Sequence, residues 1–228
     1  MADRSEDGML IAFSGRGEAP PDEPSATAHL ARLFAAALGH ESLPIARATQ
    51  VHGTAVLEAN AAPAGATVLL GEGDILMTAR PGVGLVVQTA DCVPILLVSD
   101  KAVAAIHAGW RGTALGAARA AVRELRARYG VEPDSLRAHI GPAIGLCCYE
   151  VGGEVAAQFA GDFLRRPCGG KFRLDLKAAI RAQLEAEGIL SESIQTVPLC
   201  TMCGGETLAS YRRDGRNAGR MIAMVARL

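Results

Sequence analysis

The sequence lacks an excess of charge and a long apolar run, and both absences exclude classes of function. Its 23 Lys and Arg side chains nearly balance 24 Asp and Glu, for a formal net charge of -1, so no basic field is present to hold nucleic acid or a membrane surface. No stretch approaches the ~20 apolar residues of a membrane helix. The first eight residues are polar and acidic, unlike an export signal. We therefore expect a cytoplasmic monomer whose partners are small molecules.

Histidine is scarce, and cysteine is not abundant enough to suggest a disulfide framework. The five histidines are too few and too scattered for a multi-copper cluster. Without an export signal, the six cysteines are better interpreted as reduced thiols, metal ligands or nucleophiles. Half of the 228 residues are hydrophobic, and we find no repeat and no low-complexity segment. The chain is therefore expected to form a single domain over residues 1–228.

The hydrophobic pattern changes repeatedly between short β-branched runs and segments with helical spacing. It predicts strands over 9–14, 54–57, 67–70, 74–78, 84–89, 93–98, 103–106, 136–140, 194–199 and 221–225, and helices over 26–38, 112–129, 151–159 and 176–187. Hairpin-like strand pairs occur beside strand-helix alternation. This order predicts an α/β fold, of mixed α+β character, with a mixed β-sheet core covered by helices.

Polar residues interrupt apolar or glycine-rich surroundings at three predicted strand ends, where a packed core gives them no obvious role. The segments are Gln50-Val51-His52-Gly53, Thr89-Ala90-Asp91-Cys92-Val93-Pro94 and His107-Ala108-Gly109-Trp110-Arg111-Gly112. From such positions side chains can converge on one cleft. Two imidazoles and a thiolate, from His52, Cys92 and His107, suit zinc and leave a fourth position for water, as in catalytic sites.

The spacing of these three residues is not specific, and a structural interpretation stays open beside the metal site. A lone histidine at a strand end is usually a surface or hydrogen-bonded residue, and a lone cysteine is usually a small buried hydrophobe. Trp110 is explained equally well as core, and Arg111 as a solvated charge. However, the glycines on both sides of Arg111 form a turn whose backbone amides would suit an anion.

Four further cysteines lie in two close pairs. Cys200-Thr201-Met202-Cys203 has the two-residue gap of a zinc knuckle or a redox pair, but a full structural metal site needs two more ligands. The adjacent Cys147 and Cys148 are poorly spaced for chelation. We therefore expect structural or incidental thiols in both pairs.

Taken together, the motifs resemble the YfiH-like laccase-domain family, also known as polyphenol oxidoreductases, purine nucleoside phosphorylases or peptidoglycan editing factors. The resemblance runs from about Gln50 to the C-terminus. It includes the three segments above, and it further includes residues 74–82, 140–151, 200–201 and 210–215. The resemblance implies a YfiH-like fold and zinc ligation by His52, Cys92 and His107. It also implies phosphorolysis of adenosine, inosine and methylthioadenosine, together with deamination of adenosine.

The resemblance also suggests roles for further residues. Cys92, His107 and Glu150 are expected to be catalytic, with Glu150 near the purine or the ribose. Arg16 resembles the arginine of the family's N-terminal segment. As a mechanistic hypothesis beyond the resemblance, Arg16, Arg111, Asp91 and Gln50 bind substrate or phosphate, and Asp91 also orients a histidine ligand. Around Arg16 the chain departs from the family pattern, because 18–24 lacks the usual glycine, serine and tyrosine run.

Three other functions stay open. The first is a cysteine hydrolase acting on an amide of a peptidoglycan precursor, with Cys92 as nucleophile and His107 as base. The second is a copper-dependent polyphenol oxidase, which the small number of histidines disfavours. The third is a non-catalytic domain in which Cys200 or Cys203 completes a closed, purely structural zinc site.

Overall fold

The strands of the protein form two large mixed sheets and one small antiparallel sheet. The structure is a computed structural model that describes residues 4–6, 8–17, 24–60, 63–165 and 171–228. Sheet 1 has the order β1 (Arg4–Glu6), β2 (Met9–Phe13), β15 (Met221–Arg227), β7 (Val83–Thr89), β3 (Ile45–Thr49) and β5 (Thr67–Glu72). Sheet 2 has the order β14 (Ile194–Thr196), β10 (Arg137–Ile140), β8 (Val93–Val98), β9 (Val103–Ala108), β6 (Ile75–Thr78) and β4 (Val56–Glu58). The small sheet consists of β11 (Glu150–Val151), β13 (Phe172–Leu174) and β12 (Leu164–Arg165).

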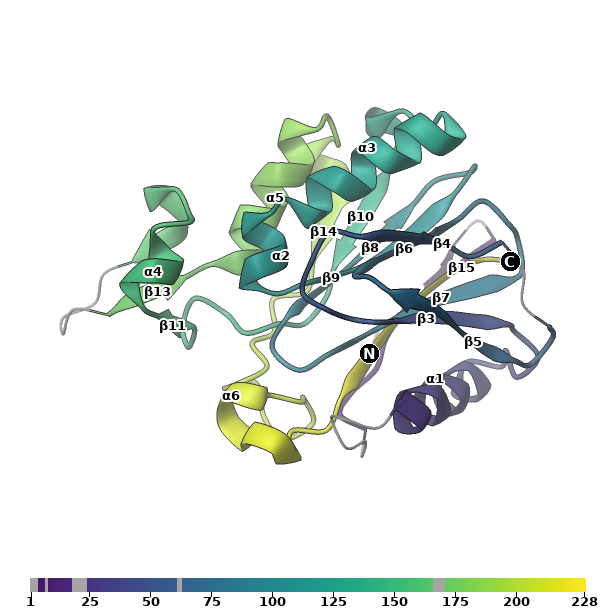
Figure 1. The fold of residues 1–228 in the computed structure, drawn as a ribbon, viewed down its shortest axis with the longest axis horizontal. Helices are drawn as coiled ribbons and strands as arrows, with labels where there is room; N and C mark the ends of the chain where they lie inside the picture. Colours follow the sequence, from purple (N-terminus) through teal and green to yellow (C-terminus); the bar gives the residue numbers. More distant parts are fainter. Residues whose placement is uncertain (1–3, 7, 18–23, 61–62, 166–170) are drawn as a thin grey trace.

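The two large sheets lie between helices, so that four layers stack (Figure 1). Strand β8 illustrates this layering, because its side chains alternate between two hydrophobic cores on opposite faces of sheet 2. Ile95 and Leu97 pack toward α3 (Ala117–Tyr129) and α5 (Leu176–Ala186). Leu96 and Val98 pack against the inner face of sheet 1. The outer face of sheet 1 is covered by α1 (Pro24–Ala37).

The predicted fold class is confirmed, with differences in detail. Two mixed sheets share the core instead of one. The predicted helix over 112–129 is two helices, α2 (Trp110–Ala114) and α3, because Gly116 adopts a left-handed φ of 82° between them. The predicted helix over 151–159 is reduced to α4 (Gly153–Ala156), since Val151 pairs with Phe172 in the small sheet instead.

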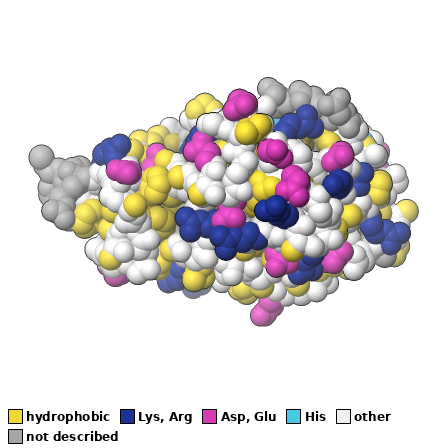
Figure 2. Space-filling model, turned by 90° about the horizontal axis from the view of Figure 1, so that it is seen from above, with side chains coloured by type: hydrophobic (Ala, Val, Ile, Leu, Met, Phe, Trp, Pro, Cys, Tyr) yellow, Lys and Arg dark blue, Asp and Glu magenta, His cyan; other side chains and the backbone are white. Residues whose placement is uncertain are grey.

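The surface agrees with the balanced composition. Figure 2 views the molecule from the side of α3 and α5 and shows acidic and basic side chains interspersed on that face. Charged side chains of α3 and α5 and their ends form ion pairs, as Arg123 does with Glu187 at 2.7 Å and Arg181 with Glu185 at 3.0 Å. Within the described ranges, no helix has the length and apolar character needed to cross a membrane.

Candidate metal centre and substrate cavity

The candidate site lies where the chain crosses from sheet 1 to sheet 2. Strands β3 and β7 are parallel neighbours in sheet 1, so their carboxyl ends lie at the same edge. Each is followed by a segment that enters sheet 2, carrying His52 toward β4 and Cys92 toward β8. His107, near the end of β9, pairs with Pro94 at the start of β8. The sheet order therefore brings together three residues that are distant in sequence.

His52, Cys92 and His107 form a compact group of potential metal ligands. One ligand atom from each residue lies within 4.8 Å of the other two. The Cys92 Sγ is 3.8 Å from the Nε2 of His52, and the two imidazole rings meet edge to face with centroids 4.8 Å apart. His107 is buried. Two nitrogens and one sulfur at such separations suit a tetrahedral metal ion that keeps one position open.

Asp74 holds this group in place through hydrogen bonds to His107 and to the segment around His52. The residue is 1% exposed, and its Oδ1 accepts a hydrogen bond from the Nδ1 of His107 at 2.7 Å. The backbone N–H groups of Val51, His52 and Gly53 donate to the same carboxylate. An ionised carboxylate only accepts, so Nδ1 carries the hydrogen and Nε2 is left to bind a metal. The predicted orienting role of Asp91 is thus filled by Asp74.

Backbone strain is concentrated at the same place. Among the described residues, His52 (φ 62°) and Asp91 (φ 85°) are the non-glycine residues with positive φ. Each costs about 1–3 kcal/mol and needs surrounding contacts that enforce it. For Asp91 those contacts are the Thr201 hydroxyl and the Arg212 N–H, which donate to its two carboxylate oxygens at 2.6 Å each. The strained residues are therefore His52, a candidate metal ligand, and Asp91, the neighbour of Cys92.

Gly109 allows the ligands to approach so closely. A Cβ at this position would lie 2.9 Å from the Cys92 Sγ and 3.0 Å from the Cδ2 of His52. Its φ of -77° and ψ of -175° are open to any residue, so the requirement for glycine is one of space. The donor types and this cleared space together fit a bound zinc or similar ion.

The titration of Cys92 and His107 is strongly coupled. Burial by itself raises the pKa of Cys92, but the positive charge and hydrogen bond of His107, aided by His52, lower the pKa to about 6. Burial by itself lowers the pKa of His107, but the Cys92 thiolate and the hydrogen bond to Asp74 raise the pKa to about 9. Near neutral pH the metal-free pair is therefore a thiolate beside an imidazolium.

A cavity of about 500 Å³ opens over this group, within the size range of small-molecule sites. It is lined by Gln50, His52, Gln88, Thr89, Ala90, Asp91, Cys92, His107, Ile144, Tyr149, Tyr211, Arg212 and Arg220. A smaller hollow of about 100 Å³ adjoins it and shares His52, Cys92 and Tyr149. Polar groups therefore surround the candidate metal position on several sides.

Three of the predicted substrate-binding residues lie at these cavities. Gln50 lines the large one, with its amide held against the backbone of Gln88 by bonds of 2.8 and 2.9 Å. Asp91 lines both cavities. Arg111 lines the smaller one, where its guanidinium stacks on Trp110 at 4.3 Å.

Two predicted residues lie elsewhere. The Glu150 carboxylate does not line either cavity and is ion-paired with Lys171 at 3.3 Å and Arg173 at 3.6 Å. Arg16 pairs with Asp214 at 3.3 Å and lines a surface hollow that it shares with Arg220, outside the large cavity. The Glu150 side chain thus lies away from the site although its neighbour Tyr149 lines both cavities.

Four further polar residues of the site received no individual role from the sequence, although three of them lie in segments 74–82, 140–151 and 210–215, which carry the family resemblance. They are Asp74, Tyr149, Arg212 and Arg220. The first is an acidic residue at the start of a buried strand, a pattern that burial alone makes unusual. The other three belong to segments that become part of the site only through the tertiary fold.

A family model described as "Multi-copper polyphenol oxidoreductase laccase" matches residues 15–228 of the chain. The chain belongs to this laccase-domain family. Purine nucleoside phosphorylase of Deinococcus radiodurans is 39% identical over 90% of this chain and 78% of its own length. Adenosine deaminase RL5, from an unknown prokaryotic organism, is 41% identical over 68% of the chain and 62% of its own length. The chain therefore spans less than two thirds of the length of some of the relatives that it matches.

Solved structures of the family have the same fold. YlmD from Geobacillus stearothermophilus superposes with a TM-score of 0.86 and 31% identity, covering 97% of this chain and 92% of that one. The protein YfiH from Bacillus licheniformis superposes with a TM-score of 0.85 and 28% identity, covering 96% and 92%. The predicted membership of the YfiH-like laccase-domain family is thus confirmed.

Proposed function

We propose that this protein is a zinc-dependent purine nucleoside phosphorylase that also deaminates adenosine and accepts methylthioadenosine. The observation that carries the proposal is the open three-ligand group of His52, Cys92 and His107 at the floor of a cavity of nucleoside size. Relatives named purine nucleoside phosphorylase and adenosine deaminase, at 39% and 41% identity, point to the same chemistry.

Zinc is the metal that the ligand set favours. His52, Cys92 and His107 would hold it, with the Nε2 of His107 presented by Asp74. When bound, zinc supplies Lewis-acid chemistry, which polarises an electronegative substrate atom and lowers the pKa of water toward neutrality. The potential metal-binding groups of the described chain contain two histidines in all, which suits a single ion better than a copper cluster.

The remaining cavity residues suit a nucleoside and an anion. The Tyr149 ring lines the cavity with the Arg212 guanidinium 5.4 Å from its centroid, and an aromatic ring at this place suits contact with a purine. Burial raises the pKa of the Tyr149 hydroxyl to about 12, so that it stays a donor. Arg212 and Arg220 bring positive charge into the large cavity, which Arg16 does not line. Phosphorolysis passes through a cationic sugar, so holding the phosphate in place beside it would supply much of the catalysis. We therefore assign phosphate binding to Arg212 and Arg220, with Arg111 in the adjoining smaller cavity.

The direct test is incubation of the purified protein with inosine and phosphate, followed by chromatography. The expected products are hypoxanthine and ribose 1-phosphate, and adenosine without phosphate should yield inosine and ammonia. Cys92→Ala should abolish both reactions. No product from the wild type, or equal product from Cys92→Ala, would remove the proposal.

A pair of arginine variants tests the phosphate assignment. Arg220→Gln should raise the KM for phosphate about 10- to 100-fold, the effect of losing one charge-assisted hydrogen bond. Arg16→Gln is the matched control, because Arg16 is paired with Asp214 outside the large cavity. Its KM should change by less than about threefold, as expected for an exposed ion pair. A larger rise of the KM for phosphate in Arg16→Gln than in Arg220→Gln would instead assign phosphate binding to Arg16.

A cysteine hydrolase is the second candidate, and the lowered pKa of Cys92 is the observation that favours it. A thiolate beside an imidazolium is also how a nucleophilic cysteine is activated. Metal analysis separates the two functions. About one zinc ion at this site, with Cys92 protected from alkylation, supports the phosphorylase. A metal-free protein with a rapidly alkylated Cys92 supports the hydrolase.

A further inference from the structure

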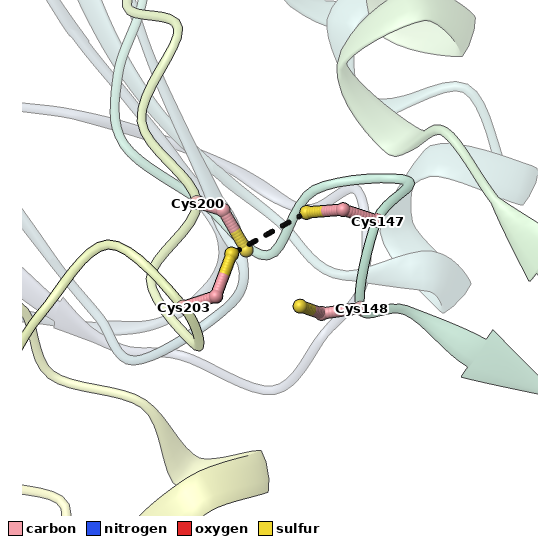
Figure 3. A group of neighbouring side chains, drawn as sticks. All are labelled: Cys147, Cys148, Cys200 and Cys203. Atoms are coloured by element: carbon pink, nitrogen blue, oxygen red, sulfur yellow. Dashed lines mark hydrogen bonds between the residues drawn. The ribbon is translucent and has the colours of Figure 1, made fainter.

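Four cysteines outside the cavity converge from two distant segments. Cys147 and Cys148 lie in the turn that follows β10, and Cys200 and Cys203 lie in the loop that follows β14. All four sulfur atoms lie within 4.8 Å of one another, and the Sγ atoms of Cys147 and Cys203 are 3.6 Å apart. Figure 3 shows the four side chains directed toward a common centre. The expectation of incidental thiols fails to account for this convergence.

The separations fit a metal ion better than disulfide bonds. Four sulfurs held about 2.3 Å from a tetrahedral zinc ion lie about 3.8 Å from each other. Sulfurs joined in a disulfide lie about 2.0 Å apart. The 3.6 Å between Cys147 and Cys203 is close to the edge of a ZnS4 tetrahedron. Neither cysteine pair supplies the four ligands of a structural zinc site by itself, and the fold brings the two pairs together.

The loop around Cys200 has the form of a zinc knuckle. The backbone N–H of Gly145 donates to its sulfur at 3.3 Å, and the N–H groups of Met202 and Cys203 also point to it. Gly204 completes the tight turn, because its N–H donates to the Cys200 carbonyl at 2.7 Å and a Cβ there would lie 2.3 Å from that oxygen. Several N–H dipoles directed at one sulfur favour its thiolate, which is the form that binds zinc.

A nearby cation offsets the charge that such a site would carry. Zinc bound by four thiolates has a net charge of about -2. Lys177 of α5 is held beside the cluster by hydrogen bonds from its Nζ to the carbonyls of Val197 and Leu199, at 3.0 and 3.1 Å. Its ammonium group interacts electrostatically with Cys200 and Cys147. Positive charge close to the sulfurs stabilises a bound tetrathiolate relative to free thiols.

We propose that Cys147, Cys148, Cys200 and Cys203 bind a second, structural zinc ion that fixes one wall of the cavity. The two joined segments carry Tyr149, which lines the cavity, and Thr201, whose hydroxyl holds the strained Asp91. The ion cross-links segments more than fifty residues apart at the point where both reach the site. Its function is positional, because four protein ligands leave no place for a substrate.

Counting metal in matched variants tests the second site independently of catalysis. Protein purified under reducing conditions should contain about two zinc ions per chain, one in each ligand group. His52→Ala and Cys203→Ser should each retain about one, and the double variant close to none. Cys168→Ser, which changes a cysteine outside the described residues, is the control for the substitution itself. His52→Ala protein without zinc would overturn the proposal and leave the cavity site untouched.

Cobalt spectra and thiol accessibility give two readouts that do not depend on activity, and the second of them needs no variant. Cobalt(II) loaded into His52→Ala should show the intense sulfur-to-metal charge-transfer bands of a tetrathiolate. In wild-type protein, alkylation followed by mass spectrometry should leave all four cysteines unmodified until a chelator is added. Alkylation at equal rates with and without chelator, or disulfides among the four in freshly purified protein, would each exclude the zinc site.

Discussion

Replacing Asp74 by asparagine tests the central arrangement of the candidate metal centre. One carboxylate oxygen accepts from His107 and the His52 N–H, and the other accepts from the N–H groups of Val51 and Gly53. An asparagine of the same size has one acceptor oxygen, so one of these two pairs must face an NH2 group. The substitution therefore keeps the volume and removes half of the acceptors.

The two orientations of the amide have different consequences. If its oxygen faces His107, the part-buried N–H groups of Val51 and Gly53 lose their acceptor, which lowers the folding stability by at most about 1–3 kcal/mol for each group. If its NH2 faces His107, the imidazole shifts its hydrogen to Nε2 and no longer presents a lone pair to the metal. Loss of an orienting group of this kind typically weakens metal binding about 10- to 100-fold.

Two measurements cover the two orientations. Competition with a chromophoric chelator gives the metal affinity, and urea unfolding gives the folding stability. Asp91→Asn is the matched control, because Asp91 is next to Cys92 in sequence but bonds Thr201 and Arg212 rather than a histidine. Its metal affinity should change by much less than that of Asp74→Asn. An Asp74→Asn protein with wild-type affinity and wild-type stability would refute the reasoning.

Three further predictions concern the same region. Gly109→Ala should weaken metal binding at least about tenfold, because its Cβ would lie 2.9 Å from the Cys92 sulfur. Gly53→Ala is the control, because its Cβ would make no contact under 3.7 Å and should leave metal affinity unchanged. Equal affinities of the two variants in a chelator competition would contradict the steric argument. Metal affinity should rise about tenfold per pH unit between the pKa of Cys92, about 6, and that of His107, about 9, because the metal must displace the imidazolium proton. Below the pKa of Cys92 the metal must displace the thiol proton as well, so the affinity should fall more steeply as the pH is lowered. An affinity that does not change with pH would contradict this pair of pKa values. Thr201→Val should lower the free energy of unfolding by about 1.5–3 kcal/mol, since its buried hydroxyl donates at 2.6 Å to a carboxylate; urea denaturation would show whether the loss is smaller.

The alternation of apolar residues determined much of the secondary structure. The strand over 93–98 is found with the predicted bounds, because each of its faces enters a core and period two is a local signal. Family motifs named His52, Cys92 and His107 as a ligand set, which spacing alone did not support. Where local signals competed, prediction was wrong, as at Gly116, whose left-handed conformation divides a helix that composition alone would continue.

The tertiary structure decided which of these residues meet and which partners they have. Two crossings between the sheets bring His52 and Cys92 to the end of β9, and the pairing of β6 with β9 places Asp74 behind His107. The same folding turns Glu150 toward Lys171 and joins two cysteine pairs into one cluster. Short-range patterns report propensity and burial along a few residues, whereas these contacts depend on the order and register of strands, which the sequence encodes only through the whole core.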